Sequence, residues 1–342
     1  MVLEFSMIHG DHRRAALERW LSVQLRVPLR AQSGGEHFFL TPASEDASFR
    51  RYFRATLADG RSYVAMDAPP EKEDCRPFVH VAGLLQQAGV HAPQVHAQDL
   101  AQGFLLLSDL GTRTYLDIID EKNAADLFTH ATEALVRWQL ATREGELPPY
   151  DEPLLRREMQ LFPDWYVARH LGVELTSRQS ESLEGIFSIL AASALAQPKV
   201  YVHRDYMPRN LMLSEPNPGV LDFQDAVLGP ITYDAVSLLR DAFASWDEQL
   251  VLDWSVRYWE KARQAGLPVD ADFGEFWRAF EWMGLQRHLK VLGIFARIHY
   301  RDGKPKYLQD TPRFIRYARD VAKRYSALSP LIRLLDELKC EP

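Results

Sequence analysis

The strongest constraint on the fold is a change of pattern near residue 107, because strand signals precede it and helical periodicity follows it. In residues 48–57, Phe49, Phe53 and Leu57 share one face of an expected strand. A turn at 58–60 and a second strand at 63–66 complete a predicted β-hairpin. Segregation of strands and helices along a chain favours an α+β fold.

Helices dominate after residue 107, apart from a short island of strands between Lys199 and Phe223. The 342 residues exceed the roughly 100–200 that are typical of one domain, so we expect two lobes. The predicted lobes are residues 1–107 and 108–342, with a link at about 108–111. Periodicity predicts helices at 11–26, about 77–88, 123–142, 153–170, 176–196, 232–244, 247–265, 271–299 and 312–326.

Composition excludes several classes of protein. The net charge of −7 argues against general nucleic-acid binding, and no apolar run reaches the roughly 18 residues of a membrane span. The first residues lack the apolar stretch of a signal peptide. The two cysteines, Cys75 and Cys340, lie far apart, as expected of a protein in a reducing cytoplasm without a disulfide framework. We therefore expect neither a nucleic-acid nor a membrane partner.

The island of strands carries a group of polar residues with a defined spacing. The apolar triplet 211–213 and the segment 220–223 flank a turn and should pair antiparallel. This pairing would bring Asn210 and Asp222 to the same end of a hairpin, with Asp205 in the loop that leads into it. Two carboxylates and a carboxamide suit Mg²⁺, which prefers oxygen ligands and also binds substrate phosphates. A carboxylate that is not bound to the metal can accept a proton from an attacking hydroxyl, as phosphoryl transfer requires.

The same residues resemble a known catalytic loop. His203-Arg204-Asp205 with Asn210, followed by Asp222-Phe223-Gln224, is similar to the aminoglycoside phosphotransferase and choline kinase branch of the protein-kinase-like superfamily. The resemblance implies a two-lobed fold, ATP and Mg²⁺ as cofactors, Asp205 as the base, and Asn210 and Asp222 as metal ligands. It also implies that His203 and Asp234 brace the loop. The alternative is that Asp205 and Asn210 merely cap turns.

The first region departs from the kinase pattern. It has no glycine-rich loop, although Ser48 in the corresponding position could donate to phosphate oxygens. The strand at 63–67 lacks the lysine that usually holds the phosphates, and the following helix lacks its glutamate partner. Arg54, or alternatively Arg50 or Arg51, could supply a substitute cation, unless these are only solvated strand residues.

The hinge region and the acceptor site complete the candidate residues. By position, the backbone groups of Ser108 and Leu110 would hydrogen-bond adenine. Residues 286–325 hold eleven Arg and Lys and three acidic residues, a net charge of +8, which suits an acceptor bearing a carboxylate or phosphate. Arg287, His288 and the nearby Lys290 are the candidates there, and Arg209 of the catalytic loop is another. The alternative for this tract is a solvated helix face.

Longer segments resemble one group more specifically. Met66-Asp67-Ala68-Pro69-Pro70, the loop 203–212, and the segments 219–226 and 286–295 are similar to the bacterial anomeric sugar kinases of cell-wall recycling. The resemblance implies phosphorylation of N-acetylmuramate or N-acetylglucosamine at the anomeric hydroxyl, and it makes the missing lysine expected. The alternatives are a kinase of choline-like amines, homoserine-like alcohols or aminoglycosides, and a nucleotide-binding pseudokinase scaffold.

Overall fold

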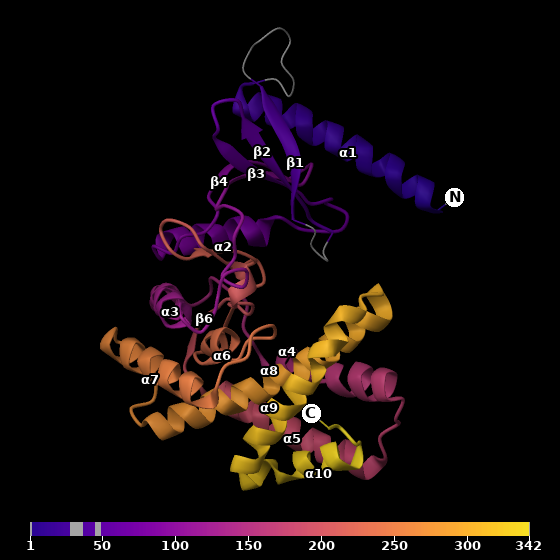
Figure 1. Ribbon diagram of the computed structural model, residues 1–342, viewed down its shortest axis with the longest axis vertical. Helices are drawn as coiled ribbons and strands as arrows, with labels where there is room; N and C mark the ends of the chain where they lie inside the picture. The colour runs from indigo at the N-terminus through magenta and orange to yellow at the C-terminus, as the bar shows by residue number, and fades with distance from the viewer. Residues whose placement is uncertain (1, 28–36, 45–48, 342) are drawn as a thin grey trace. The chain divides into compact units, whose positions relative to one another are not determined.

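The computed structural model describes residues 2–27, 37–44 and 49–341, with side chains from residue 12 onward. Internal contacts divide the chain into two units, each built from two segments (Figure 1). The first unit comprises Met1–Arg113 and Met212–Asp225, and the second comprises Thr114–Leu211 and Ala226–Pro342. The lobes at 1–107 and 108–342 stay a prediction, since this division is not a single cut.

The first unit is an antiparallel five-stranded sheet with the strand order β1-β2-β3-β5-β4. Its first three strands pair in register from Phe38↔Leu57 to Thr56↔Ser62, with a shift between Pro42 and Ser44. The element bounds are α1 Val2–Leu25, β1 Phe38–Ser44, β2 Arg51–Leu57, β3 Ser62–Asp67, α2 Arg76–Gln87, β4 Val95–Asp99 and β5 Phe104–Ser108. The strands β1 and β4 were not predicted from the sequence pattern.

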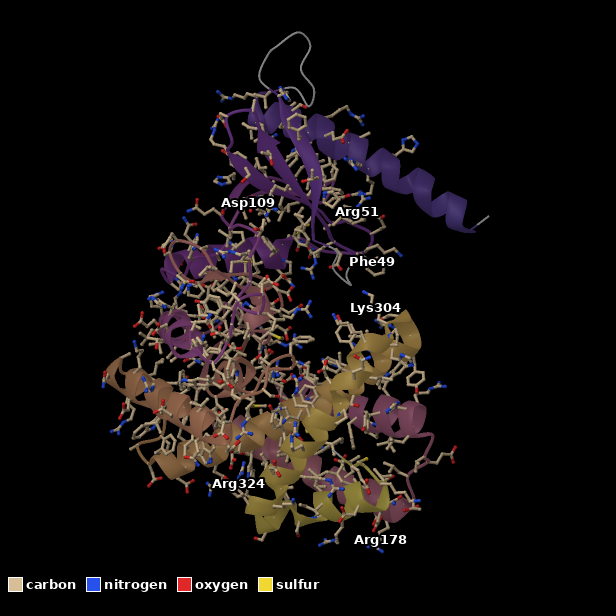
Figure 2. All side chains as sticks on the ribbon, viewed as in Figure 1. Phe49, Arg51, Asp109, Arg178, Lys304 and Arg324 are labelled. Carbon is tan, nitrogen blue, oxygen red and sulfur yellow. The ribbon has the colours of Figure 1, made fainter. Side chains whose placement is uncertain are left out.

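The core of this unit lies between α1 and the sheet, which are neighbours in Figure 1. Leu17 and Leu21 of α1 are fully buried with Phe53 and Leu57 of β2, as the alternation along that strand predicted. The prediction for Phe49 was wrong. Phe49 precedes β2 and is 62% exposed. Its side chain is labelled in Figure 2.

A buried carboxylate joins α1 to the same sheet. Asp67 ends β3 and is fully buried. Arg13 of α1 donates through Nε to its Oδ1 at 2.9 Å, and Arg51 of β2 donates through Nε to its Oδ2 at 3.0 Å. Two guanidinium groups thus satisfy a charge that would otherwise be costly to bury.

The second unit is mostly helical and contains the small sheet β6–β9, while β7 pairs with β8. No helix among the described residues is long and apolar enough to cross a membrane. After residue 113 the element bounds are α3 Ala124–Leu140, α4 Glu152–Met159, the π-helix η1 Phe162–Leu171, α5 Ser177–Ala196, β6 Lys199–Val202, the 3₁₀ turn η2 Pro208–Asn210, β7 Leu211–Met212, β8 Gly219–Val220, β9 Val227–Pro230, α6 Tyr233–Leu239, α7 Glu248–Gln264, α8 Phe273–Asp302, η3 Pro305–Asp310, α9 Thr311–Arg324, η4 Ser326–Leu328 and α10 Ser329–Glu337. Of these, β8 belongs to the first unit.

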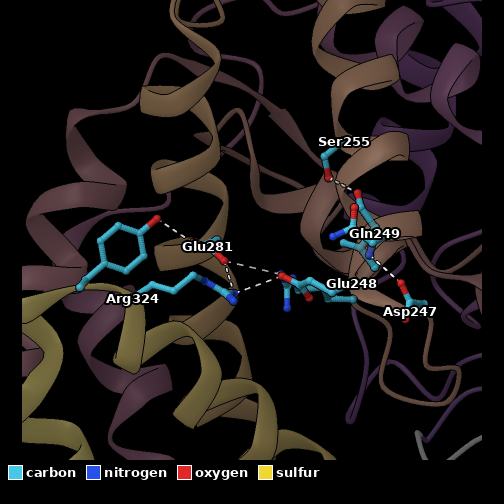
Figure 3. A network of polar contacts seen from close by, with 9 residues as sticks. Asp247, Glu248, Gln249, Ser255, Glu281 and Arg324 are labelled. Atoms are coloured by element: carbon cyan, nitrogen blue, oxygen red, sulfur yellow. Dashed lines mark hydrogen bonds and ion pairs between the residues drawn. The ribbon is translucent and has the colours of Figure 1, made fainter.

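Two predicted helices differ from the structure. The helix expected at 153–170 is divided into α4 and η1, with Pro163 in the first turn of η1, where its missing N–H is tolerated. The helix expected at 232–244 ends at Leu239, because Arg240 leaves helical geometry at φ −119° and ψ 59°. Arg240 then pairs with Glu248 of α7 at 2.8 Å. Figure 3 shows this ionic network, in which Glu248 and Glu281 meet Arg324.

Helix α8 packs unusually closely on the chain between α4 and η1. A Cβ atom on Gly293 would lie 2.3 Å from the carbonyl carbon of Leu161, so only glycine fits there. Gln286 and Lys290 lie seven and three residues before Gly293, and therefore share its face of the helix. This face reaches Glu158 of α4, whose carboxylate Gln286 and Lys290 both contact.

Candidate active site

The loop that is predicted to be catalytic, residues 203–210, begins where β6 ends. Strand β6 pairs with β9 up to Val202↔Val227, which fixes the start of the loop. Asp234, in the first turn of α6, accepts hydrogen bonds from the backbone N–H of His203 at 2.6 Å and of Arg204 at 3.0 Å. Its carboxylate is fully buried, and these two hydrogen bonds hold the two residues that precede Asp205.

Burial is the main influence on the pKa of Asp234. It disfavours the charged form and raises the pKa to about 7, against the opposing effect of the two backbone hydrogen bonds. The negative charge of Asp205 also raises this pKa, and the positive charge of Arg287 lowers it. The brace therefore changes its protonation state near neutral pH.

The backbone of the loop is strained at Arg204, which has a left-handed φ of 77°. A residue with a side chain adopts this conformation only when its surroundings hold it there. Next to it, His203 is 1% exposed, and its Nδ1 accepts the N–H of Asp205 at 3.3 Å. Asp205 itself is half-buried.

Asn210 closes the same loop from its other end. It ends the 3₁₀ turn η2, and its Nδ2 donates to the carbonyl oxygen of Asp205 at 2.9 Å. This bond fixes the orientation of the amide, with its oxygen on the side away from that carbonyl. Within the second unit, the structure thus brings together His203, Asp205, Asn210 and Asp234.

Asp222 belongs to the first unit. It adopts a left-handed φ of 62°, and its Oδ1 accepts from Nε2 of Gln224 at 2.9 Å. The neighbouring Phe223 is fully buried against Phe78 of α2, with ring centroids 4.7 Å apart. The convergence of Asn210 with Asp222 stays a prediction.

Asp222 and Asn210 each carry an oxygen atom that could bind a metal, but they belong to different units, so a metal site shared by them stays a prediction. Among the described residues, no three His, Cys, Asp or Glu side chains gather as metal ligands would. One carboxylate, from Asp222, and one amide oxygen, from Asn210, are hard ligands of the kind that Mg²⁺ accepts when phosphates and water supply the rest.

Of the predicted nucleotide contacts, Ser48 lies outside the described residues. Arg54 donates through Nε to Asp109 at 2.6 Å and through Nη2 to the carbonyl oxygen of Gly111 at 2.7 Å. Arg54 is therefore already engaged in an ion pair, as are Arg50, which pairs with Glu73, and Arg51, which shares Asp67 with Arg13. Met66, where a lysine was missing, is fully buried.

The hinge residues are held by their neighbours. Ser108 donates its backbone N–H to the carbonyl oxygen of Gln94 at 3.0 Å, and its Oγ accepts the N–H of Gln94 at 2.9 Å. Leu110 is buried against Gly219 of β8, where a Cβ atom would lie 2.8 Å from its Cδ1. The predicted adenine contacts of both residues stay predictions.

The predicted acceptor residues differ in their surroundings. Arg209 is exposed, and its guanidinium lies 5.1 Å from the ring centroid of Phe243. Arg287 is 2% exposed, and its Nη1 has no hydrogen-bond partner among the described residues. His288 is fully buried between the rings of Phe314 and Tyr317, and burial lowers its pKa well below the usual value.

The basic tract of residues 286–325 is partly paired within its own unit, since five of its eleven cations form ion pairs. Arg313, Arg319 and Arg324 each contact a carboxylate. Lys290 is 8% exposed, and its Nζ lies 3.0 Å from Oε1 of Glu158. The tract therefore offers less unpaired positive charge than its composition indicated, and Arg287 is its buried cation without an ion pair among the described residues.

Sequence reasoning missed the residue that binds the side chain of Arg204. Glu158, in the last turn of α4, accepts from Nη2 of Arg204 at 2.5 Å and also pairs with Lys290. Burial alone would raise the pKa of Glu158, but the two cations outweigh it and hold the pKa at about 2. No local pattern marks Glu158, since its partners lie 46 and 132 residues further along the chain.

Comparison with known proteins identifies the family. Residues 40–267 match the model of the phosphotransferase enzyme family. The chain is 57% identical over 330 residues to an N-acetylmuramate/N-acetylglucosamine kinase of Pseudomonas aeruginosa, covering 96% of this chain and 97% of the relative. A kinase of the same name from Neisseria meningitidis is 52% identical over 330 residues, covering 95% and 96%.

Solved structures agree on the fold. An ADP-bound aminoglycoside phosphotransferase matches 90% of this chain and 98% of its own, with a TM-score of 0.56 and 14% identity. A Plasmodium vivax ethanolamine kinase matches 83% and 82%, with a TM-score of 0.59 and 10% identity. The predicted α+β kinase-like fold is thereby confirmed, and the chain belongs to the phosphotransferase enzyme family.

Proposed function

We propose that this protein transfers the γ-phosphate of ATP to the anomeric hydroxyl of N-acetylmuramate or N-acetylglucosamine. The observation that carries the proposal is the near full-length identity of 57% and 52% to kinases named for these two sugars. The buried brace around Asp205 supports it, because a loop held this firmly suits a residue that must be positioned to react. A cytoplasmic location, where ATP is made, is part of the proposal.

In the proposed mechanism, Asp205 accepts the proton of the acceptor hydroxyl as that oxygen attacks the γ-phosphorus, and the bond from this phosphorus to the bridging oxygen breaks to release ADP. An anomeric hydroxyl is more acidic than an ordinary alcohol, so a carboxylate accepts its proton more easily. Asp234 and His203 keep the loop in place, and Asn210 fixes its far end. Mg²⁺ held by Asn210 and Asp222 would neutralise charge on the phosphates of ATP.

The nucleotide contacts of the proposal are Ser48, the backbone groups of Ser108 and Leu110, and Arg54. Since Arg54 pairs with Asp109, it would reach a phosphate only by exchanging that carboxylate for the nucleotide. Its present contacts support a second role, in which it ties β2 to residues 109–111.

For the acceptor, Arg287 is the residue proposed to favour a carboxylate, such as the lactyl group of N-acetylmuramate. Arg287 interacts with the charges of Asp234 and Asp241, but its Nη1 has no hydrogen-bond partner among the described residues. A carboxylate that reaches this nitrogen would form a charge-assisted hydrogen bond. Arg209 is the proposed exposed contact. The enclosed ring of His288 supports a packing role beside Arg287, while its role as a sugar contact stays a prediction.

The test is ADP release with N-acetylmuramate, N-acetylglucosamine, choline and kanamycin side by side, followed by phosphorus NMR of the product. We expect turnover with the amino sugars, coupling of the phosphorus to the anomeric proton, and an acid-labile phosphate. A stable phosphate on the 6-hydroxyl would refute the anomeric position. Turnover of choline or kanamycin alone would refute the sugar assignment, and no turnover at all would favour the pseudokinase alternative.

A further inference from the structure

A buried ionic cluster lies behind the catalytic loop of the second unit, and the proposed chemistry does not use it. Its centre is Glu158, whose side chain is 7% exposed. Oε1 receives the two cations, Arg204 and Lys290, and Oε2 accepts from the hydroxyl of Tyr150 and, at 3.4 Å, from Gln286. One carboxylate therefore joins α4, α8 and the loop that contains Asp205.

The contacts form a closed ring around Arg204. Its side chain binds Glu158, which pairs with Lys290, and Nζ of Lys290 donates to the hydroxyl of Tyr233 at 3.0 Å. Tyr233 is the neighbour of Asp234, whose Oδ1 accepts the backbone N–H of Arg204. Arg204 is thus held at its backbone and at its side chain by groups that are themselves connected.

This double attachment explains how Arg204 keeps its left-handed backbone. Its φ of 77° is unfavourable for a residue with a Cβ, and such strain persists only where contacts over-determine it. Asp205 is the next residue in the chain, so any relaxation at Arg204 redirects its carboxylate.

The position of the cluster is set by close packing. Gly293 allows α8 to touch Leu161, three residues after Glu158, and brings Lys290 and Gln286 within reach of that side chain. Tyr150 is placed by its backbone N–H, which donates to Leu228 of β9 at 2.8 Å. The cluster is therefore built on rigid elements, as a positioning device requires.

We infer that Glu158 is a positioning residue, which holds Arg204, and through it Asp205, by balancing the charges of Arg204 and Lys290 in the protein interior. The inference rests on the proposed role of Asp205 as the base. Loss of the Glu158 charge leaves two buried cations facing each other, which would push Arg204 out of its position.

The experiment compares Glu158→Gln with the wild type and with the control Glu152→Gln. Glu152 is on the same helix and forms an exposed ion pair with Arg156 at 2.7 Å, so its loss should change kcat by less than about 2-fold. For folded Glu158→Gln we expect kcat to fall about 100-fold, the scale of a misplaced reacting group, with the KM values for ATP and sugar nearly unchanged. Wild-type kcat in this variant would overturn the inference, as would a loss of kcat no larger than the unfolded fraction measured by circular dichroism.

A charge-balanced variant tests whether the unbalanced charge of Arg204 and Lys290 causes the loss of kcat. Glu158→Gln combined with Lys290→Met removes one cation together with the anion, so kcat should recover about 10-fold over the single variant, because the two residues are coupled. No recovery would overturn the role of charge balance.

If Glu158→Gln does not fold, the variant Arg204→Gln tests the inference instead. This change leaves Glu158 paired with Lys290 and removes only the tie to the loop, so kcat should fall at constant KM, and a wild-type kcat would overturn the inference. Every ratio is measured with whichever acceptor the wild type phosphorylates, so an error in the proposed sugar does not affect the result. Full turnover by Asp205→Asn would instead refute the proposed base.

Discussion

Replacing Asp234 by asparagine tests the brace of the catalytic loop with almost no change of shape. The carboxylate accepts one backbone N–H on each oxygen, from His203 and from Arg204, and is fully buried. In Asp234→Asn, the oxygen can accept one of these bonds, but the new NH₂ group faces the other N–H. Two donors then meet where a donor and an acceptor met before.

The expected effects of Asp234→Asn on stability and on kcat follow from these contacts. A buried N–H left without an acceptor costs about 1–3 kcal/mol of unfolding free energy. Catalysis should suffer more, since displacing a reacting group by about 1 Å can cost about 100-fold in rate. We therefore expect a fall in kcat of about two orders of magnitude. The lost acceptor lowers stability, but removal of the buried charge offsets this loss where Asp234 would be ionised.

The pH dependence gives an independent signature. Burial raises the pKa of Asp234 to about 7, so below this pH the protonated carboxyl loses one acceptor, and the wild-type kcat should decline. Stability should move in the opposite direction. Because the folded pKa exceeds the unfolded value of 3.8, protonation favours the folded state; this contribution is complete below pH 3.8 and is lost as the pH rises through 7. At about 1.4 kcal/mol per pKa unit, it amounts to about 4 kcal/mol.

The assay measures kcat and urea unfolding between pH 5 and 9 for the wild type and Asp234→Asn (about two units on either side of the expected midpoint). The variant should lose both the decline of kcat near pH 7 and the corresponding slope of stability. If the variant keeps the wild-type kcat, or if both proteins show the same decline near pH 7, the assigned brace or its titration is wrong.

Three further changes test the proposed roles. Asp205→Asn should keep the KM for ATP but lower kcat by about 10²–10⁴-fold, the contribution of a general base, and near-normal turnover would contradict that role. Asp222→Ala should abolish turnover and weaken Mg²⁺-dependent nucleotide binding measured by calorimetry, because it removes the anionic ligand; unchanged Mg²⁺ dependence would show that the metal is held elsewhere. Met66→Lys should lower the thermal midpoint without tightening ATP binding, since Met66 is fully buried between Tyr52 and Leu105 on neighbouring strands, and a gain in affinity would show that the missing lysine is a true deficit.

Short-range signals were sufficient for the family and the fold class. The hairpin at β2 and β3 and the catalytic loop rest on patterns within a few residues, and both family and fold are confirmed. Element ends were harder to predict, because they depend on packing. No local sequence pattern predicts that α6 ends at Leu239. The next residue, Arg240, leaves helical geometry and pairs with Glu248.

The electrostatics of the site depended on contacts that a linear sequence does not display. Lys290 was predicted to be part of a basic surface for the acceptor, but its charge is paired with Glu158 from another helix. The same holds for Arg54 and Asp109, which are 55 residues apart. Charge counted along a tract therefore overestimates the charge that a ligand meets.

The buried ion pairs of Asp67 have a practical consequence for anyone who shortens this chain. The family match begins at residue 40, which suggests that the preceding residues could be removed. Deleting them would take away Arg13, one of the two cations on a fully buried carboxylate, and would expose the face of the sheet that Leu17 and Leu21 cover. Such a truncated protein would be prone to aggregate, because an uncovered apolar sheet face offers other chains a surface to bind. The helix before the family boundary is therefore part of the folding unit.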